Sequence, residues 1–152
     1  MSDVTFFLTS CKRHDLLRVC LETFVKHNTY PIEHGIIVED SDQSLEWVRE
    51  ILPFKKLDLI NTAGRQGQLA NIDRYYPLIK TPYVFHCEDD FVFIRDSFIE
   101  PSKKILEADD CCINVWLTEY DPVWETTSRD PSNLTNHARI LPPYHQIGRA
   151  HV

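Results

Sequence analysis

The sequence lacks the features that mark nucleic-acid-binding, secreted and membrane-spanning proteins. Its 152 residues hold 16 lysines and arginines against 23 aspartates and glutamates, which gives a net charge of -7. Because affinity for a phosphate backbone rests on basic patches, we expect no nucleic-acid partner. No apolar stretch is long enough to span a bilayer, and no basic segment followed by an apolar run opens the chain. We therefore expect no transmembrane segment and no signal peptide.

The cysteines also lack a recognisable framework. Five cysteines form an odd set in which no two are separated by two residues. Such a set is typical of reduced thiols in a reducing compartment, so we predict a cytoplasmic protein whose cysteines act as small apolar side chains. No internal repeat or low-complexity tract is visible. The length fits one domain with a sizeable core.

Apolar runs and amphipathic segments alternate along residues 4–117. Runs rich in β-branched or aromatic residues predict strands at residues 4–9, 35–38, 57–60, 83–87 and 111–117. Apolar residues at helical spacing predict helices at residues 17–24, 45–52, 69–76 and 98–106. This alternation predicts an α/β fold with a doubly wound, mostly parallel sheet of about five strands and helices on both faces.

Several local features refine the predicted helices. Asp42 and Asp96 precede two of them, and we expect both to act as N-terminal caps. Leu69, Ile72 and Tyr76 are expected to share one side of the third helix.

Charged and polar side chains follow three of the predicted strands. These are the segments Ser10-Cys11-Lys12-Arg13, Glu39-Asp40-Ser41-Asp42 and Glu88-Asp89-Asp90. In open parallel sheets, ligands bind beyond the carboxyl ends of the strands, near the point where the strand order reverses. We therefore expect all three segments to open onto one ligand-binding edge.

The acidic turn Glu88-Asp89-Asp90 has two interpretations. Clustered carboxylates repel one another, and a site that keeps them ionised generally supplies a hard divalent cation such as Mg²⁺ or Mn²⁺. Such an ion binds one or two carboxylates together with substrate phosphates, which would let an acidic protein hold a diphosphate. Taken alone, however, three acids at a strand end more commonly solvate a turn or cap a helix.

Four motifs in order resemble the N-terminal, nucleotide-sugar-binding part of GT-A-type glycosyltransferases, especially the family-2-like group. The opening strand, the turn with Arg13 and the helix that ends in Tyr30-Pro31 match the start of these enzymes. The other matches are the strand ending in acids and Ser41, the glycine-containing loop and helix over residues 61–71, and a DxD-type motif at residues 88–90. An ordered set of four is far more specific than any one motif. The resemblance implies a Rossmann-related fold and a metal-dependent glycosyltransferase.

The resemblance also implies roles for individual residues. The acid after the second strand would contact the base of the nucleotide, which points to Asp40, or to Glu39 if the register differs. Ser10 and Arg13 would approach the nucleotide, and Gln68 and Asn71 would lie near its base or phosphates. Asp90 would be the direct ligand of Mn²⁺ or Mg²⁺, and Asp89 would face the ribose or the donor sugar. Glu88 departs from the usual aspartate, which leaves its own role open.

Two other residues in this part of the chain are candidate metal ligands by type. His86 and Cys87 occupy adjacent positions in a predicted strand, where side chains point to opposite faces. We therefore interpret them as core residues.

The resemblance covers residues 1–117 as a nucleotide-sugar-binding domain and does not extend to a complete enzyme. Residues 118–146 are rich in proline and polar residues, and we expect them to begin an incomplete acceptor-side region. Residues 147–152 match a translated sequencing adapter, so we expect a non-native tail on a truncated gene. Similar inverting enzymes take their catalytic base from the downstream half, and no catalytic residue is assigned here.

The function expected from this sequence is transfer of a sugar from a nucleotide-diphosphate donor, with a UDP-sugar as the first guess. The acceptor, whether glycan, lipid or protein, is open, and this fragment is expected to lack activity if its base is missing. The alternative is a non-catalytic nucleotide-binding or interaction module of the same fold. A phosphoreceiver is disfavoured because its paired acids would follow the first strand, where Ser10 to Arg13 stand instead.

Overall fold

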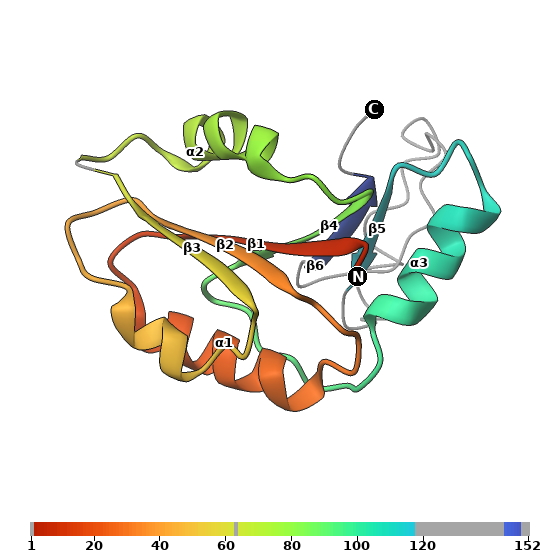
Figure 1. The fold of residues 1–152 in the computed structure, drawn as a ribbon, viewed down its shortest axis with the longest axis horizontal. Helices are drawn as coiled ribbons and strands as arrows, with labels where there is room; N and C mark the ends of the chain where they lie inside the picture. Colours follow the sequence, from red (N-terminus) through yellow and green to blue (C-terminus); the bar gives the residue numbers. More distant parts are fainter. Residues whose placement is uncertain (1, 63, 118–144, 150–152) are drawn as a thin grey trace, which may run out of the picture.

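A six-stranded sheet with helices on both faces forms the centre of the protein, seen in a computed structural model that describes residues 2–62, 64–117 and 145–149. The strands are β1 (Val4–Ser10), β2 (His34–Glu39), β3 (Lys56–Asn61), β4 (Tyr83–Glu88), β5 (Asn114–Leu117) and β6 (His145–Arg149). The helices are α1 (His14–His27), α2 (Gln68–Tyr75) and α3 (Ile99–Ala108), and there are two 3-10 helices in the described residues, η1 (Glu46–Glu50) between β2 and β3 and η2 (Tyr76–Leu78) after α2. Helix α1 covers one face of the sheet and α2 covers the other (Figure 1).

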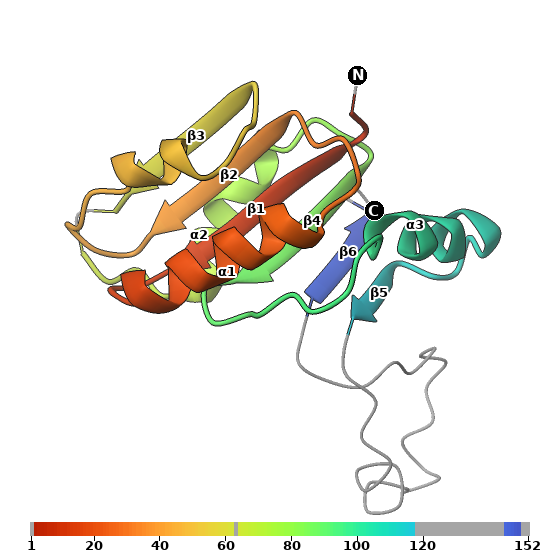
Figure 2. The ribbon, with the colours of Figure 1, turned by 90° about the horizontal axis from the view of Figure 1, so that it is seen from below.

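The strand order is β3-β2-β1-β4-β6-β5 (Figure 2). Strands β3, β2, β1 and β4 run parallel, whereas β6 is antiparallel to its neighbours β4 and β5. The predicted doubly wound, mostly parallel sheet is therefore confirmed. From β1 the chain builds outward to β2 and β3 and then returns to place β4 on the other side of β1. The strand order thus reverses between β1 and β4, where such sheets form ligand-binding crevices.

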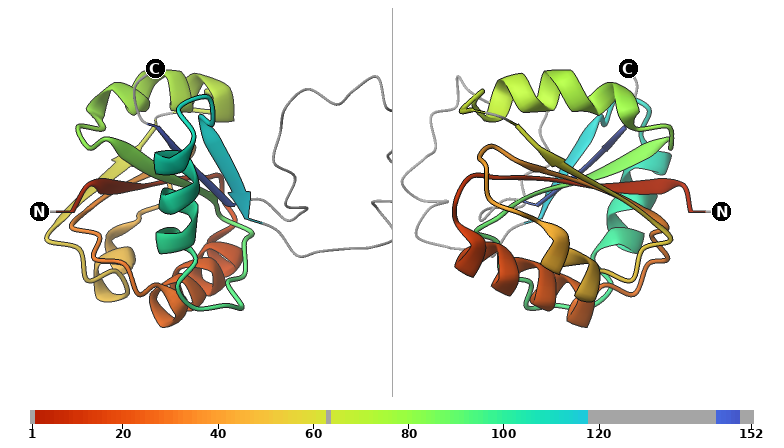
Figure 3. Two further views of the ribbon diagram at one scale, coloured as in Figure 1. Left: turned by 90° about the vertical axis from the view of Figure 1, so that its right-hand side faces the viewer. Right: turned by 60° about the vertical axis from the view of Figure 1, so that its left-hand side comes forward.

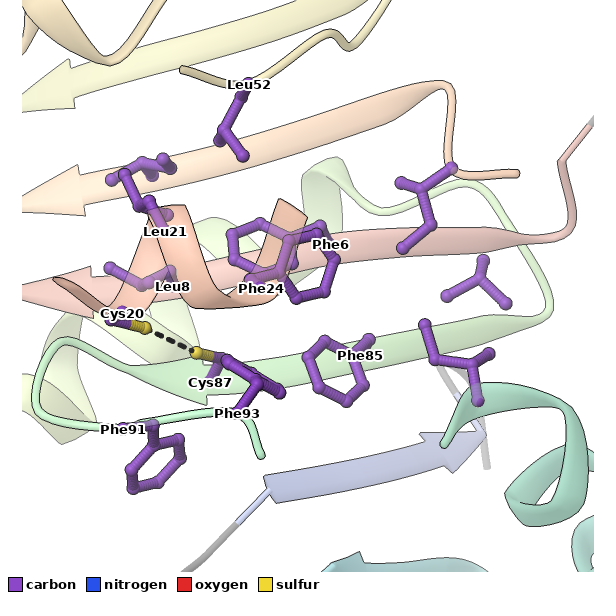
Figure 4. Packing of buried hydrophobic residues seen from close by; sticks show 14 of the residues in the cluster. Phe6, Leu8, Cys20, Leu21, Phe24, Leu52, Phe85, Cys87, Phe91 and Phe93 are labelled. Carbon is purple, nitrogen blue, oxygen red and sulfur yellow. Dashed lines mark hydrogen bonds between the residues drawn. The ribbon is translucent and has the colours of Figure 1, made fainter. Parts of the chain in front are cut away.

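Apolar side chains fill the space between the sheet and α1. Phe24 of α1 packs on two strands at once, with ring centroids 4.6 Å from Phe6 and 5.7 Å from Phe85 (Figure 4). Every residue of β1 is buried, as expected for a central parallel strand. A second cluster, built on Phe7, Ile36, Val38, Ile79 and Val84, lies on the opposite face against α2 and η2. The two clusters hold the shared carboxyl-terminal edge of the parallel strands in place.

The segment after β2 differs from the sequence prediction. Its apolar residues Leu45, Val48 and Leu52 are buried as expected, but the segment forms only the short helix η1. Tight bonds from Val48 N to Leu45 O (2.9 Å) and from Ile51 N to Val48 O (3.0 Å) close its turns. Pro53 lies three residues after the end of η1 and disfavours helical backbone at Leu52, so the turns do not extend into an α-helix. Asp42 lies four residues before η1 and does not cap it.

A further expectation about the helices was wrong, and one apolar residue lies in an unexpected place. Asp96 does not cap α3, which begins at Ile99; its carboxylate instead lies 2.6 Å from Nδ1 of His27 at the end of α1. Leu69, from the apolar side of the predicted third helix, is 78% exposed. The residue that α2 buries is Asn71.

The far end of the sheet carries an element that the sequence did not predict. Strand β6 pairs with β4 from Tyr83↔Arg149 to His86↔Gln146, and β5 pairs with its other side. Helix α3 stands against these two strands (Figure 3). β5 is also shorter than the expected 111–117. The proposed acceptor-side region lies outside the described residues except for 145–146, and the expected non-native origin of residues 147–152 stays a prediction.

Among the residues that the structure describes, no helix has both the length and the apolar character needed to cross a membrane.

Candidate functional site

An open cleft of about 100 Å³ lies at the carboxyl-terminal ends of β1, β2 and β4, beside the start of α2. In Figure 1 this is the end of the sheet from which both α1 and α2 begin. The cleft is lined by Thr9, Ser10, Cys11, Arg13, Asp40, Gln68, Asn71, Glu88 and Asp89. In the paired strands Ser10 lies opposite Glu39, and Thr9 lies opposite Glu88. The register therefore brings the three polar segments of the sequence to one point, as predicted.

Asp40 fixes the loop that leads into α2. Its Oδ1 accepts hydrogen bonds from the hydroxyl of Thr62 (2.5 Å) and from the backbone N–H of Gln66 (2.8 Å), and its Oδ2 accepts one from Gly67 N (2.8 Å). Burial alone would raise the pKa of this carboxyl, but these hydrogen bonds and one from Asn71 outweigh burial and lower the pKa to about 2. The φ angle of Gly67 is 86°, which favours glycine. Asp40 is thus an ionised anchor for this wall of the cleft.

The turn between β1 and α1 is held between two buried carboxylates. The N–H of Cys11 points to Oδ2 of Asp89 (3.4 Å), and the N–H of Lys12 donates to Oε1 of Glu39 (2.8 Å). His14 Nε2 lies 3.5 Å from the other oxygen of Glu39. Lys12 has a φ of 58°, a left-handed conformation that is costly for a residue with a side chain. The two carboxylates at the neighbouring strand ends offset this cost and set the direction in which Arg13 leaves the turn.

Arg13 bridges two acids of the predicted DxD-type motif. Its Nε donates to Oδ2 of Asp89 (3.2 Å), and its Nη2 donates to the other oxygen of the same carboxylate. Its Nη1 donates to Oδ2 of Asp90 (3.0 Å). The guanidinium of Arg13 therefore links the end of β1 to the end of β4, the two neighbouring strands between which the strand order reverses.

The two partners of this bridge experience different environments. Burial raises the pKa of Asp89, and the attraction of Arg13 offsets that effect only in part. For Arg13, burial would lower the pKa, but Asp89 and Asp90 together raise it. We interpret the contact as an ion pair, because the two-pronged geometry uses both carboxylate oxygens as acceptors.

Negative charge dominates the cleft. Four carboxylates, those of Asp40, Glu88, Asp89 and Asp90, lie in it or at its rim, against the guanidinium of Arg13. An anionic ligand therefore needs a further cation to bind here.

The acids at the end of β4 have the chemistry that a hard divalent cation requires. Asp90 has a 40% exposed side chain and Glu88 is partly buried, whereas the side chain of Asp89 is 1% exposed and engaged by Arg13. Among residues 2–62, 64–117 and 145–149, no group of three or more His, Cys, Asp or Glu side chains forms a ready metal cage. One or two carboxylates completed by phosphate oxygens is the usual arrangement for Mg²⁺ in nucleotide sites, so the donor set fits such an ion.

The structure brings the predicted site residues together with two differences in position. Ser10, Arg13, Asp40, Gln68, Asn71, Glu88 and Asp89 all line the cleft. Glu39 lies fully buried behind it, on the α1 side, so Asp40 is the acid of this pair that faces the cleft. Asp90 lies at the rim, where it contacts Arg13.

Three residues of the site were missed by the sequence reasoning. Thr9 and Cys11 line the cleft, and Thr62 holds Asp40 from the end of β3. Thr62 carried a usable signal, since it directly follows a predicted strand at the same edge. Cys11 acts through its backbone N–H, which no side-chain pattern reports.

His86 and Cys87 are packing residues, as predicted from their alternation in β4. Nδ1 of His86 lies 2.5 Å from the hydroxyl of Tyr76, and burial lowers the pKa of His86 to about 4, so the ring is neutral at physiological pH. On the other face, the sulfur of Cys87 lies 3.4 Å from that of Cys20 (Figure 4).

The fold is shared with solved glycosyltransferases, although no protein-family model and no curated protein sequence matches the chain. It is similar to the mannosyltransferase PcManGT from Pyrobaculum calidifontis, solved with GDP-Man and Mn²⁺, with a TM-score of 0.67 and 17% identity over 78% of this chain and 36% of that one. It is also similar to residues 1–349 of TarS from S. aureus, solved alone (TM-score 0.65, 11% identity) and with UDP-GlcNAc (0.64, 12%).

These TarS matches cover 97% of this chain, and 47% and 45% of the solved chains. The chain therefore has the expected GT-A-like α/β fold and spans less than half the length of these structures. At such low identities the likeness establishes the fold alone.

Proposed function

We propose that this chain is the donor-binding part of a glycosyltransferase, which holds a nucleotide-diphosphate sugar and a divalent cation in the cleft at the end of β1 and β4. The observation that carries this proposal is the convergence of the acidic turn, Arg13 and the Asp40-anchored loop where the strand order reverses. The expected function rests on these contacts and on the shared fold.

Different residues of the cleft would bind different parts of the donor. Asp90 would hold the cation, with Glu88 as a second carboxylate, and the cation would link these acids to the diphosphate. When bound, such an ion stabilises the charge that develops on a leaving diphosphate. The wall formed by Asp40, Gln68 and Asn71 would face the nucleoside.

The acceptor half of the reaction belongs to residues beyond this site. The chain covers 36% to 47% of the solved glycosyltransferases described above. We therefore propose donor binding for this chain and leave the acceptor and the catalytic base unassigned. The inverting outcome and the cytoplasmic location stay predictions from the sequence.

Calorimetry tests donor binding directly. UDP and GDP are titrated into the 152-residue chain with and without Mn²⁺, for the wild type, for Asp90→Asn and for Asp96→Asn. We expect binding of at least one nucleotide to depend on Mn²⁺, and we expect Asp90→Asn to weaken it by at least about tenfold, since even residues that only support a metal ligand contribute this much.

Asp96→Asn is the matched control, because Asp96 is an exposed carboxylate that contacts His27 at the opposite end of α1. It should leave binding unchanged. Nucleotide binding that ignores both Mn²⁺ and Asp90→Asn would favour the alternative, a non-catalytic nucleotide-binding module. A folded chain that binds neither nucleotide would contradict the proposal.

A further inference from the structure

Arg13 occupies an unexpected place for a cleft that is to receive a metal ion. Its guanidinium lies among the acids of the turn after β4 and contacts the same Asp90 that is proposed to hold the cation. One carboxylate thus faces two candidate positive partners. The inference drawn from this competition rests on the proposed function, because that function assigns the cation to Asp90.

The two halves of the Arg13 contact differ in strength. Toward Asp89 the guanidinium donates through both Nε and Nη2, and the side chain of Asp89 is 1% exposed. Removing the partner of a buried charge is strongly destabilising, so this half persists. Toward Asp90 a single N–H donates over 3.0 Å between two partly exposed groups. Exposed ion pairs contribute little, so this half can exchange for another partner at small cost.

The backbone prevents Arg13 from moving away as a whole. The turn from which it extends is tied by Cys11 N to Asp89 and by Lys12 N to Glu39. The exchangeable Nη1 group therefore stays at the cleft, which Ser10 and Glu88 also line.

We propose that Arg13 is a second, resident cation of the donor site, and that ligand binding divides the Arg13–Asp90 contact. The metal ion takes the carboxylate of Asp90, and the N–H group of Arg13 that this releases donates to the diphosphate. Asp89 is then the anchor of Arg13, not a ligand of the sugar as the resemblance suggested. In the absence of ligand, Arg13 neutralises Asp90 and weakens its affinity for a metal ion alone.

This arrangement makes the metal and the nucleotide bind better together than apart. A divalent ion by itself must displace a guanidinium from Asp90, and a diphosphate by itself meets a cleft with four carboxylates. Together, the ion lies between the carboxylates and the diphosphate, and the released N–H group of Arg13 meets a phosphate oxygen. Arg13 therefore opposes one ligand and supports the other.

Opposite effects on the two ligands provide the test. Affinities of the 152-residue chain for Mn²⁺ alone and for UDP or GDP with Mn²⁺ are measured by calorimetry, with free Mn²⁺ followed by electron paramagnetic resonance. In Arg13→Lys the ammonium can pair with Asp89 but cannot span both acids. We expect Mn²⁺ alone to bind several-fold tighter and the nucleotide to bind on the order of tenfold weaker.

A second variant, in which the charge of the buried pair is removed from both partners, separates the proposed effect from misfolding. Arg13→Gln combined with Asp89→Asn removes the buried pair without leaving an unpaired charge, and it should show the same two opposite changes. Arg18→Lys is the control, since Arg18 is an exposed residue of α1 that pairs with Glu22 outside the cleft. It should change neither affinity.

The outcomes separate this inference from the proposed function. If wild-type chain binds nucleotide with Mn²⁺ but both Arg13 variants change the two affinities in the same direction, or change neither, the resident-cation role is wrong and donor binding stands. If the wild type binds no nucleotide with Mn²⁺, both proposals fall together.

Discussion

Replacing Asp40 by asparagine tests whether an ionised carboxylate holds the loop before α2. The wild-type carboxylate accepts hydrogen bonds from Thr62, Gln66 and Gly67. An asparagine that keeps its oxygen toward Thr62 and Gln66 turns its own NH₂ toward the N–H of Gly67, so two donors face each other. An unsatisfied buried donor and the loss of charge-assisted bonds together cost about 2 to 3 kcal/mol at pH 7.

The pH dependence gives a sharper measure. The pKa of Asp40 falls from 3.8 to about 2 on folding, which corresponds to about 2 kcal/mol of unfolding free energy at neutral pH. Because the folded-state pKa is the lower one, this contribution is complete above about pH 5 and is lost as the pH falls toward 2; about half remains at pH 3. The difference between wild type and Asp40→Asn should therefore shrink by about 1 kcal/mol from pH 7 to pH 3.

Urea unfolding of both proteins at pH 7 and pH 3 measures that difference. All other carboxylates are shared by the two proteins, so their titration cancels in the comparison. Asp73→Asn, at an exposed position of α2, serves as the control and should differ little from wild type at either pH. A loss of stability in Asp40→Asn that is equal at pH 7 and pH 3, or that is absent, would refute the ionised anchor.

Three further predictions concern the framework around the cleft. Leu17→Ala should lower the unfolding free energy by about 2 to 4 kcal/mol in urea titrations, since Leu17 is fully buried. Leu16→Ala, at a neighbouring position that is 46% exposed, should lower it by less than about 1 kcal/mol. Equal losses in the two variants would contradict the packing of α1. Gly67→Ala should lower stability by about 1 to 2 kcal/mol in thermal unfolding, because the φ of 86° strains any side chain, and an unchanged melting temperature would argue against this loop conformation. Cys20 and Cys87 are fully buried and should not react with a thiol reagent until the chain is unfolded. Mass spectrometry can count the labelled cysteines, and rapid labelling of these two in the native chain would contradict their burial.

Much of the fold could be predicted because local pattern and tertiary environment agree. The apolar run of β1 reads as a strand buried on both faces, and it lies at the centre of the parallel sheet. The positions that α1 buries, among them Leu17 and Phe24, recur at helical spacing. Because parallel strands end at one edge, the amino-acid sequence alone was enough to place the acids after β2 and β4 together.

The errors arose where tertiary contacts decide. Leu69 continues an apolar pattern, but it is 78% exposed, and the residue that α2 buries is the polar Asn71. Aspartate is a residue type that often caps helices, but the carboxylate of Asp96 instead contacts His27, which lies far away in the sequence. Strand β6 joins the sheet through pairing with β4, a partner about sixty residues earlier, and no periodicity within residues 145–149 reports that pairing.

The site shows the same division. The acids of the turn after β4 were recognisable by type and spacing, but their unequal roles follow from burial, which depends on the packing of the whole fold. Asp89 is enclosed and engaged by Arg13, whereas Asp90 lies at the rim. Thr62 and the N–H of Cys11 contribute through contacts that depend on the exact course of two loops.

The most direct test of donor binding is the position of a bound manganese ion relative to the cleft. Amide spectra of the isotopically labelled chain are recorded with UDP or GDP while Mn²⁺ is added in small amounts, with Mg²⁺ as the diamagnetic reference. We predict that paramagnetic broadening centres on Cys11, Arg13, Asp89 and Asp90, that it requires the nucleotide for full effect, and that Asp90→Asn removes it. Broadening centred elsewhere, for example around His34 and Asp58 on β2 and β3, or broadening indifferent to Asp90→Asn, would contradict the proposed donor site.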